Sequence, residues 1–306
     1  MQYKIFTDCT ADLTKEIIKE FDLTIIPLSY ISNGCEYCYL AGSEKDAKTF
    51  YDFLRDKQNL STSCANAQTF IDYFEKELKN GNDVLYIGFS SGLSQTFNNA
   101  LLAKEELLKK YPNRKIECVD SLLASLGQGL MVYSICLYRQ EGATIEQAVE
   151  RILNTRLNIN SIFTVKTLAN LVRGGRISKL TYAVGTAIDI KPTMYVSENG
   201  KLLSYGKVIG RKRSIFSIAD KVAKTIINPE TQTVFIAHGD CLEEAQYLAK
   251  LIESKIKVKN FVFNYIDPVI GVHSGPDTLA VFYFGVSREE AVKQVATITC
   301  CEVQKY

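Results

Sequence analysis

The sequence predicts an α/β protein of two domains, a mostly parallel sheet with helices on both faces followed by a mixed sheet with helices. In the first half, short apolar runs such as residues 84–89 alternate with amphipathic segments such as residues 97–108, the pattern of a buried parallel sheet. In the second half, two strand patterns flank the Ser197–Gly200 turn, which indicates antiparallel pairing. A chain of 306 residues can bury two cores, and we expect domains at 1–157 and 158–306.

Composition indicates a globular protein whose net charge does not favour a strongly charged partner. Hydrophobic residues make up 46% of the chain, and 36 Lys and Arg against 34 Asp and Glu give a net charge of +2. Such a charge provides no overall attraction to nucleic acid, so we expect no nucleic-acid partner. The N-terminal residues enter a strand pattern without a signal peptide, and no apolar run is long enough for a membrane span. We therefore expect a cytoplasmic protein.

Cysteine and histidine usage gives no support for a metal site. The nine cysteines are an odd number scattered along the chain, which favours free thiols. Cys35 and Cys38 have CxxC spacing, but a structural zinc site normally needs four ligands and no second such pair is present. The chain also lacks GxGxxG and a glycine-rich loop ending in Lys-Ser or Lys-Thr. We expect neither a metal nor a nucleotide cofactor.

Apolar patterning gives the order of elements in the first half. Strands are expected at residues 3–7, 23–30, 84–89 and 116–119. Helices are expected around residues 17–21, 50–54, 70–78, 97–108, 126–137 and 145–157. Pro27 indicates an edge or irregular position in the second strand, because proline donates no backbone hydrogen bond. The hydroxyl-rich stretch Leu60–Ser63 is expected to lead into a helix.

The second half mixes strands, helices and glycine-rich turns. Strands are expected at residues 161–165, 193–196, 202–209, 234–238, 261–265 and 278–284. Helices are expected at residues 167–172, 211–227 and 242–256. Arg173–Arg176 is expected to form a basic turn, and Gly271–Asp277, which contains His273, a tight turn.

Hydroxyl-rich loops follow several strands of the predicted parallel sheet. The carboxyl ends of parallel strands meet at one edge, so residues 8–10, 90–96 and 120–121 should lie together, with Thr62 and Ser63 as further candidates. Residues 90–96 precede a helix, whose first amides and positive end favour an anion. We interpret this edge as a seat for a carboxylate or phosphate. Ser and Thr also cap helices, so a purely structural role remains the alternative.

The segment Gly88–Gly92 permits a catalytic interpretation as well. It matches GxSxG, the turn that exposes a nucleophilic serine between a strand and a helix. Ser90 followed by an Asp such as Asp189 or Asp267 and then His273 has the order of a hydrolase triad. A serine hydrolase of the α/β type is the alternative function.

Several motifs in this order resemble those of the DegV family of bacterial fatty-acid-binding proteins, over about residues 3–284. The motifs lie at residues 7–13, 62–63, 90–96, 120–121, 174–178, 191–192, 238–239 and 271–276. The resemblance implies two α/β domains with a long-chain fatty acid between them and no catalytic activity of the binder itself. Some members deliver the acid to a fatty acid kinase, which implies such a partner and a place in phospholipid metabolism.

The resemblance also implies the residues of the binding site. The carboxylate would be held by Thr62, in the Thr62–Ser63 motif, and by Ser94, with Arg176 and His273 close by. The chain departs from the family pattern at other positions. Cys9 stands where serine is usual, Ala65 and Asn66 replace Pro and Ser, and Gln95 and Asp277 each replace a glycine.

A basic cluster surrounds the predicted hairpin of the second half. It consists of Lys201, Lys207, Arg211, Lys212 and Arg213. This cluster either is an ordinary solvated face or docks an acidic kinase domain or an anionic membrane surface during exchange of the acid.

Overall fold

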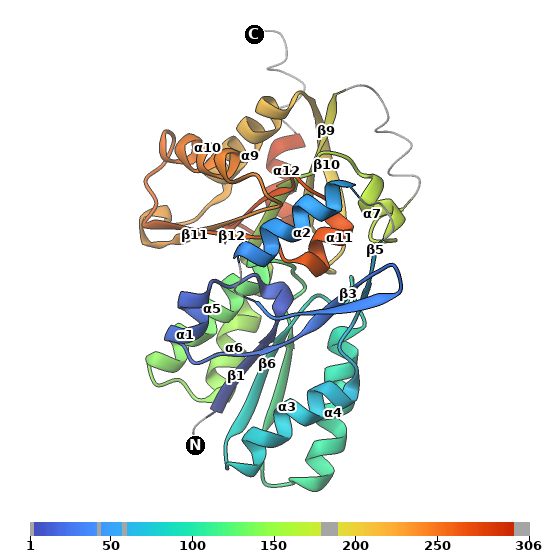
Figure 1. The fold of residues 1–306 in the computed structure, drawn as a ribbon. Coiled ribbons are helices and arrows are strands. Elements are labelled where there is room, and N and C mark those ends of the chain that lie inside the picture. The colour runs from blue at the N-terminus through green and yellow to red at the C-terminus, as the bar shows by residue number, and fades with distance from the viewer. Residues whose placement is uncertain (1–2, 42–43, 57–59, 179–188, 297–306) are drawn as a thin grey trace.

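The computed structural model describes residues 3–41, 44–56, 60–178 and 189–296. The two halves of the chain lie one above the other in Figure 1, each around its own sheet. The predicted α/β class, with a parallel first sheet and a mixed second sheet, is confirmed. Among the described residues, no helix is long and apolar enough to cross a membrane.

The N-terminal half is built on a four-stranded parallel sheet in the order β2-β1-β6-β7. Its strands are β1 (Tyr3–Asp8), β2 (Thr24–Ile26), β6 (Asp83–Gly88) and β7 (Ile116–Asp120). Its helical segments are η1 (Cys9–Ala11), α1 (Lys15–Glu20), α3 (Ala67–Lys79), α4 (Thr96–Lys110), α5 (Leu126–Gln140) and α6 (Ile145–Thr155). Side chains alternate along the strands, so Tyr86 packs with α3 and α4 while Leu85 and Ile87 pack with α5. Both faces of the sheet are therefore covered by helices.

The prediction of a single strand at residues 23–30 is wrong. The chain breaks at Pro27 into β2 and β3 (Leu28–Ser32), and β3 joins a separate antiparallel sheet in the order β4-β3-β5. Its other strands are β4 (Cys35–Tyr39) and β5 (Leu60–Ser63), with α2 (Glu44–Asp56) between them. Asn33 and Gly34 both have positive φ and close the β3–β4 hairpin. That Asn-Gly pair was the local signal for the hairpin.

The C-terminal half is built on a six-stranded sheet in the order β10-β9-β8-β13-β11-β12, in which only the β11–β12 pair is parallel. Its strands are β8 (Ile159–Thr164), β9 (Ile190–Val196), β10 (Leu202–Ile209), β11 (Thr233–His238), β12 (Asn260–Tyr265) and β13 (Leu279–Phe284). Its helical segments are η2 (Arg156–Asn158), α7 (Ala169–Arg173), α9 (Arg211–Thr225), η3 (Pro229–Thr231), α10 (Leu242–Glu253), α11 (Pro268–Ser274) and α12 (Arg288–Ala296). The predicted β9–β10 hairpin is confirmed. The domain boundary at residues 157 and 158 stays a prediction.

Helix α5 joins the two halves. Its residues are buried almost throughout and contact strands of both large sheets. A Cβ atom on Gly127 would lie 2.8 Å from the ring of Phe282 in β13, so the helix approaches the second sheet closely. The two halves therefore share one continuous apolar cluster.

The prediction of a tight turn at residues 271–277 is wrong for its first part, which belongs to α11. Asp267 caps this helix, since its carboxylate accepts a hydrogen bond from the Ile270 amide at 2.6 Å, and Pro268 occupies the first turn. The Asp-Pro pair was a helix-start signal in the sequence. Gly271 lets α2 pack against α11, because a Cβ there would lie 2.8 Å from Phe50 and from Tyr51. Figure 1 shows α2 beside α11, within the C-terminal half.

Candidate functional site

A cavity of about 260 Å³ lies between the two halves of the chain. Its wall includes β5 and the loop after β6 from the N-terminal half, and β8, β9, β13 and α11 from the C-terminal half. Most of the wall is apolar, formed by side chains such as Leu28, Leu93, Phe163, Val196, Val269 and Phe282. The five site residues expected from the sequence, Thr62, Ser63, Ser94, Arg176 and His273, all line this one cavity.

The predicted sheet edge lies beside the cavity. The Asp8 carboxylate, at the end of β1, accepts a hydrogen bond from the Phe89 amide at 3.2 Å, and Asp120, at the end of β7, accepts one from the Ser91 amide at 3.3 Å. These bonds hold the loop after β6 against the neighbouring strand ends, as expected from a parallel sheet. The loop residues Leu93, Ser94 and Gln95 form part of the cavity wall.

The stretch Leu60–Ser63 leads into helix α3 as expected, but Thr62 does not cap that helix. It lies within β5, where it pairs with Tyr30 of β3, and Asn66 caps α3 instead. The Thr62 hydroxyl lies 2.9 Å from Nε2 of His273, 211 positions away in the sequence. The strand therefore fixes Thr62 at the cavity, and the contact joins it to α11.

Ser94 lies in the turn that leads into α4. Its hydroxyl is 2.9 Å from the Thr96 hydroxyl and accepts a hydrogen bond from the Thr96 amide at 3.2 Å. The structural role of a helix-start serine is therefore present in addition to the position on the cavity wall. Helix α4 begins at Thr96, so its partial positive charge lies next to this wall.

His273 is a neutral, buried histidine on α11. Burial, together with the positive charges of Arg176 and Arg173, lowers its pKa to about 3. Its Nε2 contacts Thr62, whereas Nδ1 is buried without a hydrogen-bond partner. A Cβ on Gly174 would lie only 2.2 Å from Nδ1, so the glycine-rich turn passes directly over the ring. The ring proton lies on Nδ1 if the Thr62 hydroxyl donates to Nε2, and on Nε2 if that hydroxyl accepts.

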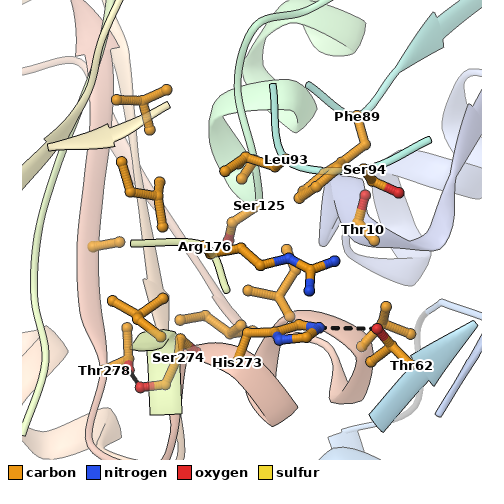
Figure 2. Close-up of a pocket in the computed structure, with 18 of the residues that line it drawn as sticks. Thr10, Thr62, Phe89, Leu93, Ser94, Ser125, Arg176, His273, Ser274 and Thr278 are labelled. Atoms are coloured by element: carbon orange, nitrogen blue, oxygen red, sulfur yellow. Dashed lines mark hydrogen bonds between the residues drawn. The ribbon is translucent and has the colours of Figure 1, made fainter. Parts of the chain in front are cut away.

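Arg176 places a positive charge in the cavity. Its guanidinium donates to the Gly174 carbonyl oxygen, and within the described ranges it forms no ion pair with a carboxylate. Burial lowers the pKa of Arg176, which still leaves a guanidinium charged at neutral pH. Figure 2 shows the guanidinium between Thr62 and His273 on one side and Ser94 and Thr10 on the other. A half-buried cation with hydroxyls around it is suited to an anionic group.

Ser90 has no catalytic geometry. Its side chain is fully buried, and its hydroxyl donates to the Gly200 carbonyl oxygen at 2.8 Å and accepts from the Gly92 amide at 3.2 Å. The hydrogen-bond partner of His273 is Thr62 rather than Ser90. Ser90 of the GxSxG segment therefore joins the loop after β6 to the β9–β10 turn. The hydrolase alternative has no support.

Several wall residues were not anticipated from the sequence. They are the hydroxyl residues Ser125, Ser161 and Thr278, whereas Thr10 and Ser274 also line the wall but lie in the segments 8–10 and 271–276 that the sequence had marked. No motif marks Ser161 or Thr278, because each is an isolated hydroxyl in a strand pattern whose orientation only the folded sheet defines. Ser125 and Thr10 engage partners within the N-terminal half, namely Asp12 and Asp8.

A family model described as "Uncharacterised protein, DegV family" matches residues 2–286. The chain belongs to the DegV family. A DegV domain-containing protein of Clostridium perfringens (strain 13 / Type A) is 41% identical over 288 residues, which are 94% of this chain and 99% of that protein. The family resemblance inferred from the scattered motifs is thus confirmed.

Two solved structures of DegV relatives share the fold. A Thermotoga maritima protein, whose structure is described as revealing a fatty acid binding function, is 26% identical with a TM-score of 0.81, over 94% of this chain and 100% of its own. A stearic acid-binding protein from Eubacterium ventriosum ATCC 27560 is 25% identical with a TM-score of 0.81, over 94% of this chain and 99% of its own. Both of these structural relatives are thus described as fatty-acid-binding proteins.

Proposed function

We propose that this protein binds a long-chain fatty acid in the cavity between its two halves and presents the carboxylate to a fatty acid kinase. The carboxylate is held by Thr62, Ser63 and Ser94, with Arg176 and His273 beside it, and the acyl chain lies along the apolar wall. The observation that carries the proposal is the Arg176 guanidinium, without a carboxylate partner among the described residues, on the wall of a mostly apolar cavity. The fatty-acid-binding structural relatives support the same ligand class.

The energetics favour the acyl chain as the main source of affinity. Burial of each methylene contributes about 0.8 kcal/mol, so a long chain outweighs any single headgroup contact. A hydrogen bond to a charged group contributes about 1.5–3 kcal/mol. The headgroup residues therefore orient the ligand, and the apolar wall retains it.

Exposure along the cavity supports presentation of the carboxylate. Thr62 and Ser94 are partly exposed and their neighbours Cys64 and Gln95 are exposed, whereas Val196 and Phe282 on the wall are buried. A kinase could thus approach the carboxyl end without extracting the chain. In-line phosphoryl transfer needs a well-positioned attacking oxygen, which a fixed set of donors provides.

The edge strand β10 supports a transient contact with the kinase or with a membrane surface. Leu202 lines the cavity, while Leu203 beside it and Ile209 at the other end of the strand are 45% and 62% exposed. Lys201, Lys212 and Arg213 of the basic cluster are exposed nearby in the chain. Arg211 is engaged differently, because its Nε donates to Glu244 at 3.0 Å. The remaining cations and the apolar edge form a surface suited to an acidic or anionic partner.

Lipid extraction tests the proposed ligand. Protein purified from cells should release a long-chain fatty acid on denaturing extraction, measured by mass spectrometry. Absence of lipid, or recovery of a nucleotide or sugar instead, would contradict the proposal.

Paired measurements on Ser94→Ala and His273→Ala test presentation. Both substitutions should reduce kinase-dependent acyl phosphate formation more than they reduce the lipid content of the same preparation. Equal losses, or full turnover after either substitution, would show that these residues do not present the carboxylate.

A further inference from the structure

A row of four side chains crosses the cavity face of the second sheet. Leu202 of β10 pairs with Val196 of β9, and Ser161 of β8 pairs with Phe282 of β13. The β8–β9 register, with Ile162 opposite Tyr195, puts Ser161 opposite Val196 at the next position. Directly opposite residues of antiparallel strands point to the same face, and all four residues line the cavity. Three are apolar and one carries a hydroxyl.

Ser161 is a buried residue whose hydroxyl faces the cavity without a hydrogen-bond partner among the described residues. The residue is only 4% exposed, and its side chain makes no hydrogen bond within the part of the chain that the structure describes. The next cavity-facing pair of β8 and β13, Phe163 and Ala280, is apolar as well. A buried hydroxyl normally has a hydrogen-bond partner, so this one is available to a ligand.

The position of Ser161 separates it from the headgroup residues. Strand β13 begins at Leu279, shortly after α11 and His273, and Leu279 pairs with Thr164 at the end of β8. Ser161 lies three residues further along β8, or about 10 Å at roughly 3.3 Å per residue. In the proposed binding mode the hydroxyl therefore faces the acyl chain rather than the carboxylate.

We propose that Ser161 makes this protein selective for long-chain fatty acids that carry a hydroxyl group near the middle of the acyl chain. The inference rests on the proposed function and adds the ligand class to it. An unsubstituted acid leaves the Ser161 hydroxyl unpaired against methylene groups, whereas a hydroxylated acid pairs with it. A water molecule in place of the ligand hydroxyl would need two or more polar partners, and the flanking Val196 and Phe282 side chains provide none.

The expected selectivity follows from one neutral hydrogen bond in a dry site. Pairing of a buried hydroxyl changes affinity by about tenfold, since about 1.4 kcal/mol is a factor of ten. Ser161→Ala removes the partner and the unpaired group together. It should therefore weaken binding of the hydroxylated acid about tenfold and strengthen binding of the unsubstituted acid a few-fold.

Displacement of a fluorescent fatty acid from the full-length protein tests the proposal. Stearic acid and 12-hydroxystearic acid are compared on the wild type, Ser161→Ala and Val196→Ala. The wild type should prefer 12-hydroxystearic acid, and Ser161→Ala should abolish or invert that preference. Val196→Ala, the matched truncation in the same row, should weaken both acids alike, because it removes only apolar contact.

Three other outcomes are decisive. If wild-type protein prefers stearic acid, or if Ser161→Ala keeps the original preference, the selectivity is wrong although fatty acid binding stands. If neither acid displaces the probe and extraction yields no lipid, the proposed function itself fails. The comparison of the two acids on the wild-type protein needs no variant. The proposal can therefore be contradicted even if the Ser161→Ala protein does not fold.

Discussion

Single residues at the cavity combine one cation with neutral donors. Arg176 carries the charge, while the low pKa of His273, about 3, keeps its ring uncharged at physiological pH. A neutral imidazole can donate one hydrogen bond and accept another, so it orients Thr62 or a ligand without adding charge. The proposed site can thus attract a carboxylate and still release it, because Arg176 is the only cation among the described residues that line the cavity.

Removal of the Ser94 hydroxyl should weaken binding without abolishing it. We expect Ser94→Ala to lower fatty acid affinity about ten- to a hundredfold, the value of one hydrogen bond to a charged group. Ser91→Ala is the matched control, since Ser91 lies in the same loop but not on the cavity wall. Isothermal titration with a long-chain acid measures both variants. An equal effect of the two substitutions would rule out a specific role for Ser94.

Two buried carboxyl groups, Asp12 and Asp267, join the halves behind the cavity and should make stability depend on pH. Asp12 accepts a hydrogen bond from the Asp267 amide at 3.0 Å. Burial raises the pKa of Asp12 well above its usual value and that of Asp267 to about 7. The folded state therefore binds more protons than the unfolded state between about pH 4 and 7, so stability falls as the pH rises through that range.

Asp267→Asn tests this pH dependence. Asparagine retains the capping oxygen of α11 but cannot ionise, so the variant should lose less stability than the wild type between pH 5 and 8. Urea unfolding at both pH values measures the difference. The assignment would be contradicted if the wild-type stability rose between pH 5 and 8. It would also be contradicted if the stability of the wild type and of the variant changed by the same amount.

Among the elements, the turn after α7 and helix α11 fit together only because Gly174 has no side chain. Gly174→Ala would bring a Cβ to 2.2 Å from His273 Nδ1 and should displace the ring from Thr62. Its backbone has φ −74°, which alanine adopts freely, so the effect comes from the ring alone. We expect weaker ligand binding by about tenfold, and no additional loss when His273→Ala is already present. Additive losses in this double-mutant cycle would show another cause.

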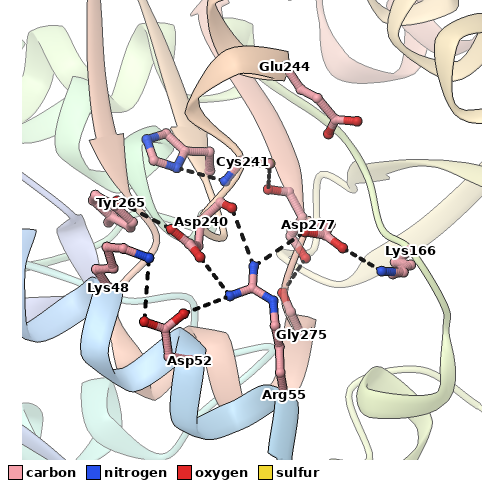
Figure 3. Close-up of polar contacts among 12 residues, drawn as sticks. Lys48, Asp52, Arg55, Lys166, Asp240, Cys241, Glu244, Tyr265, Gly275 and Asp277 are labelled. Carbon is pink, nitrogen blue, oxygen red and sulfur yellow. Dashed lines mark hydrogen bonds and ion pairs between the residues drawn. The ribbon is translucent and has the colours of Figure 1, made fainter.

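Helix α2 is clamped onto the C-terminal half by Arg55. Figure 3 shows its guanidinium between Asp240, in the loop after β11, and Asp277, in the loop before β13. The Arg55 Nη1 atom lies 2.6 Å from the Asp240 carboxylate, and Nη2 lies 3.6 Å from that of Asp277. Tyr51 of the same helix donates to the Ile266 carbonyl oxygen at 3.0 Å. Because α2 packs on α11, this clamp supports the wall that carries His273.

Arg55→Ala should affect ligand dissociation more than it affects the stability of the fold. A partly exposed ion pair contributes about 1 kcal/mol or less to stability, so the unfolding free energy should change little. Dissociation of a bound fluorescent fatty acid should become several-fold faster, and added salt should accelerate it in the wild type. Lys48→Ala is the matched control, because the ion pair of Lys48 within the described residues is with Asp52 of its own helix and not with the C-terminal half. An unchanged dissociation rate in Arg55→Ala would show that the Arg55 contacts do not control ligand exchange.

At the scale of the whole molecule, the near-zero net charge leaves the basic cluster by β10 as a local feature. Reversal of its exposed members in Lys212→Glu/Arg213→Glu should slow kinase turnover or exchange with anionic vesicles. Lys15→Glu/Lys19→Glu, exposed on α1, makes the same change in net charge and should have a smaller effect. Kinase assays and vesicle-transfer assays at low salt measure both. Equal slowing by the two pairs would indicate a general charge effect and end the docking hypothesis.

The local pattern of the sequence determined the two large sheets and most of their helices. The apolar run of β6, the amphipathic α4 and the β9–β10 turn each carry their signal within a few residues, because burial and turn geometry act locally. Ordered motifs also identified the DegV family and named Thr62, Ser63, Ser94, Arg176 and His273 as site candidates.

Only the tertiary structure decided how these residues meet. Thr62 lies in β5 ahead of α3, and His273 lies in α11 rather than in the expected turn. The two side chains touch across 211 positions. Such contacts leave no local signal, because they form only when distant segments close on one another. The same holds for Ser161, whose orientation into the cavity depends on the register of three neighbouring strands. The sequence thus determined which chemical groups are available, and chain folding determined which of them face one ligand.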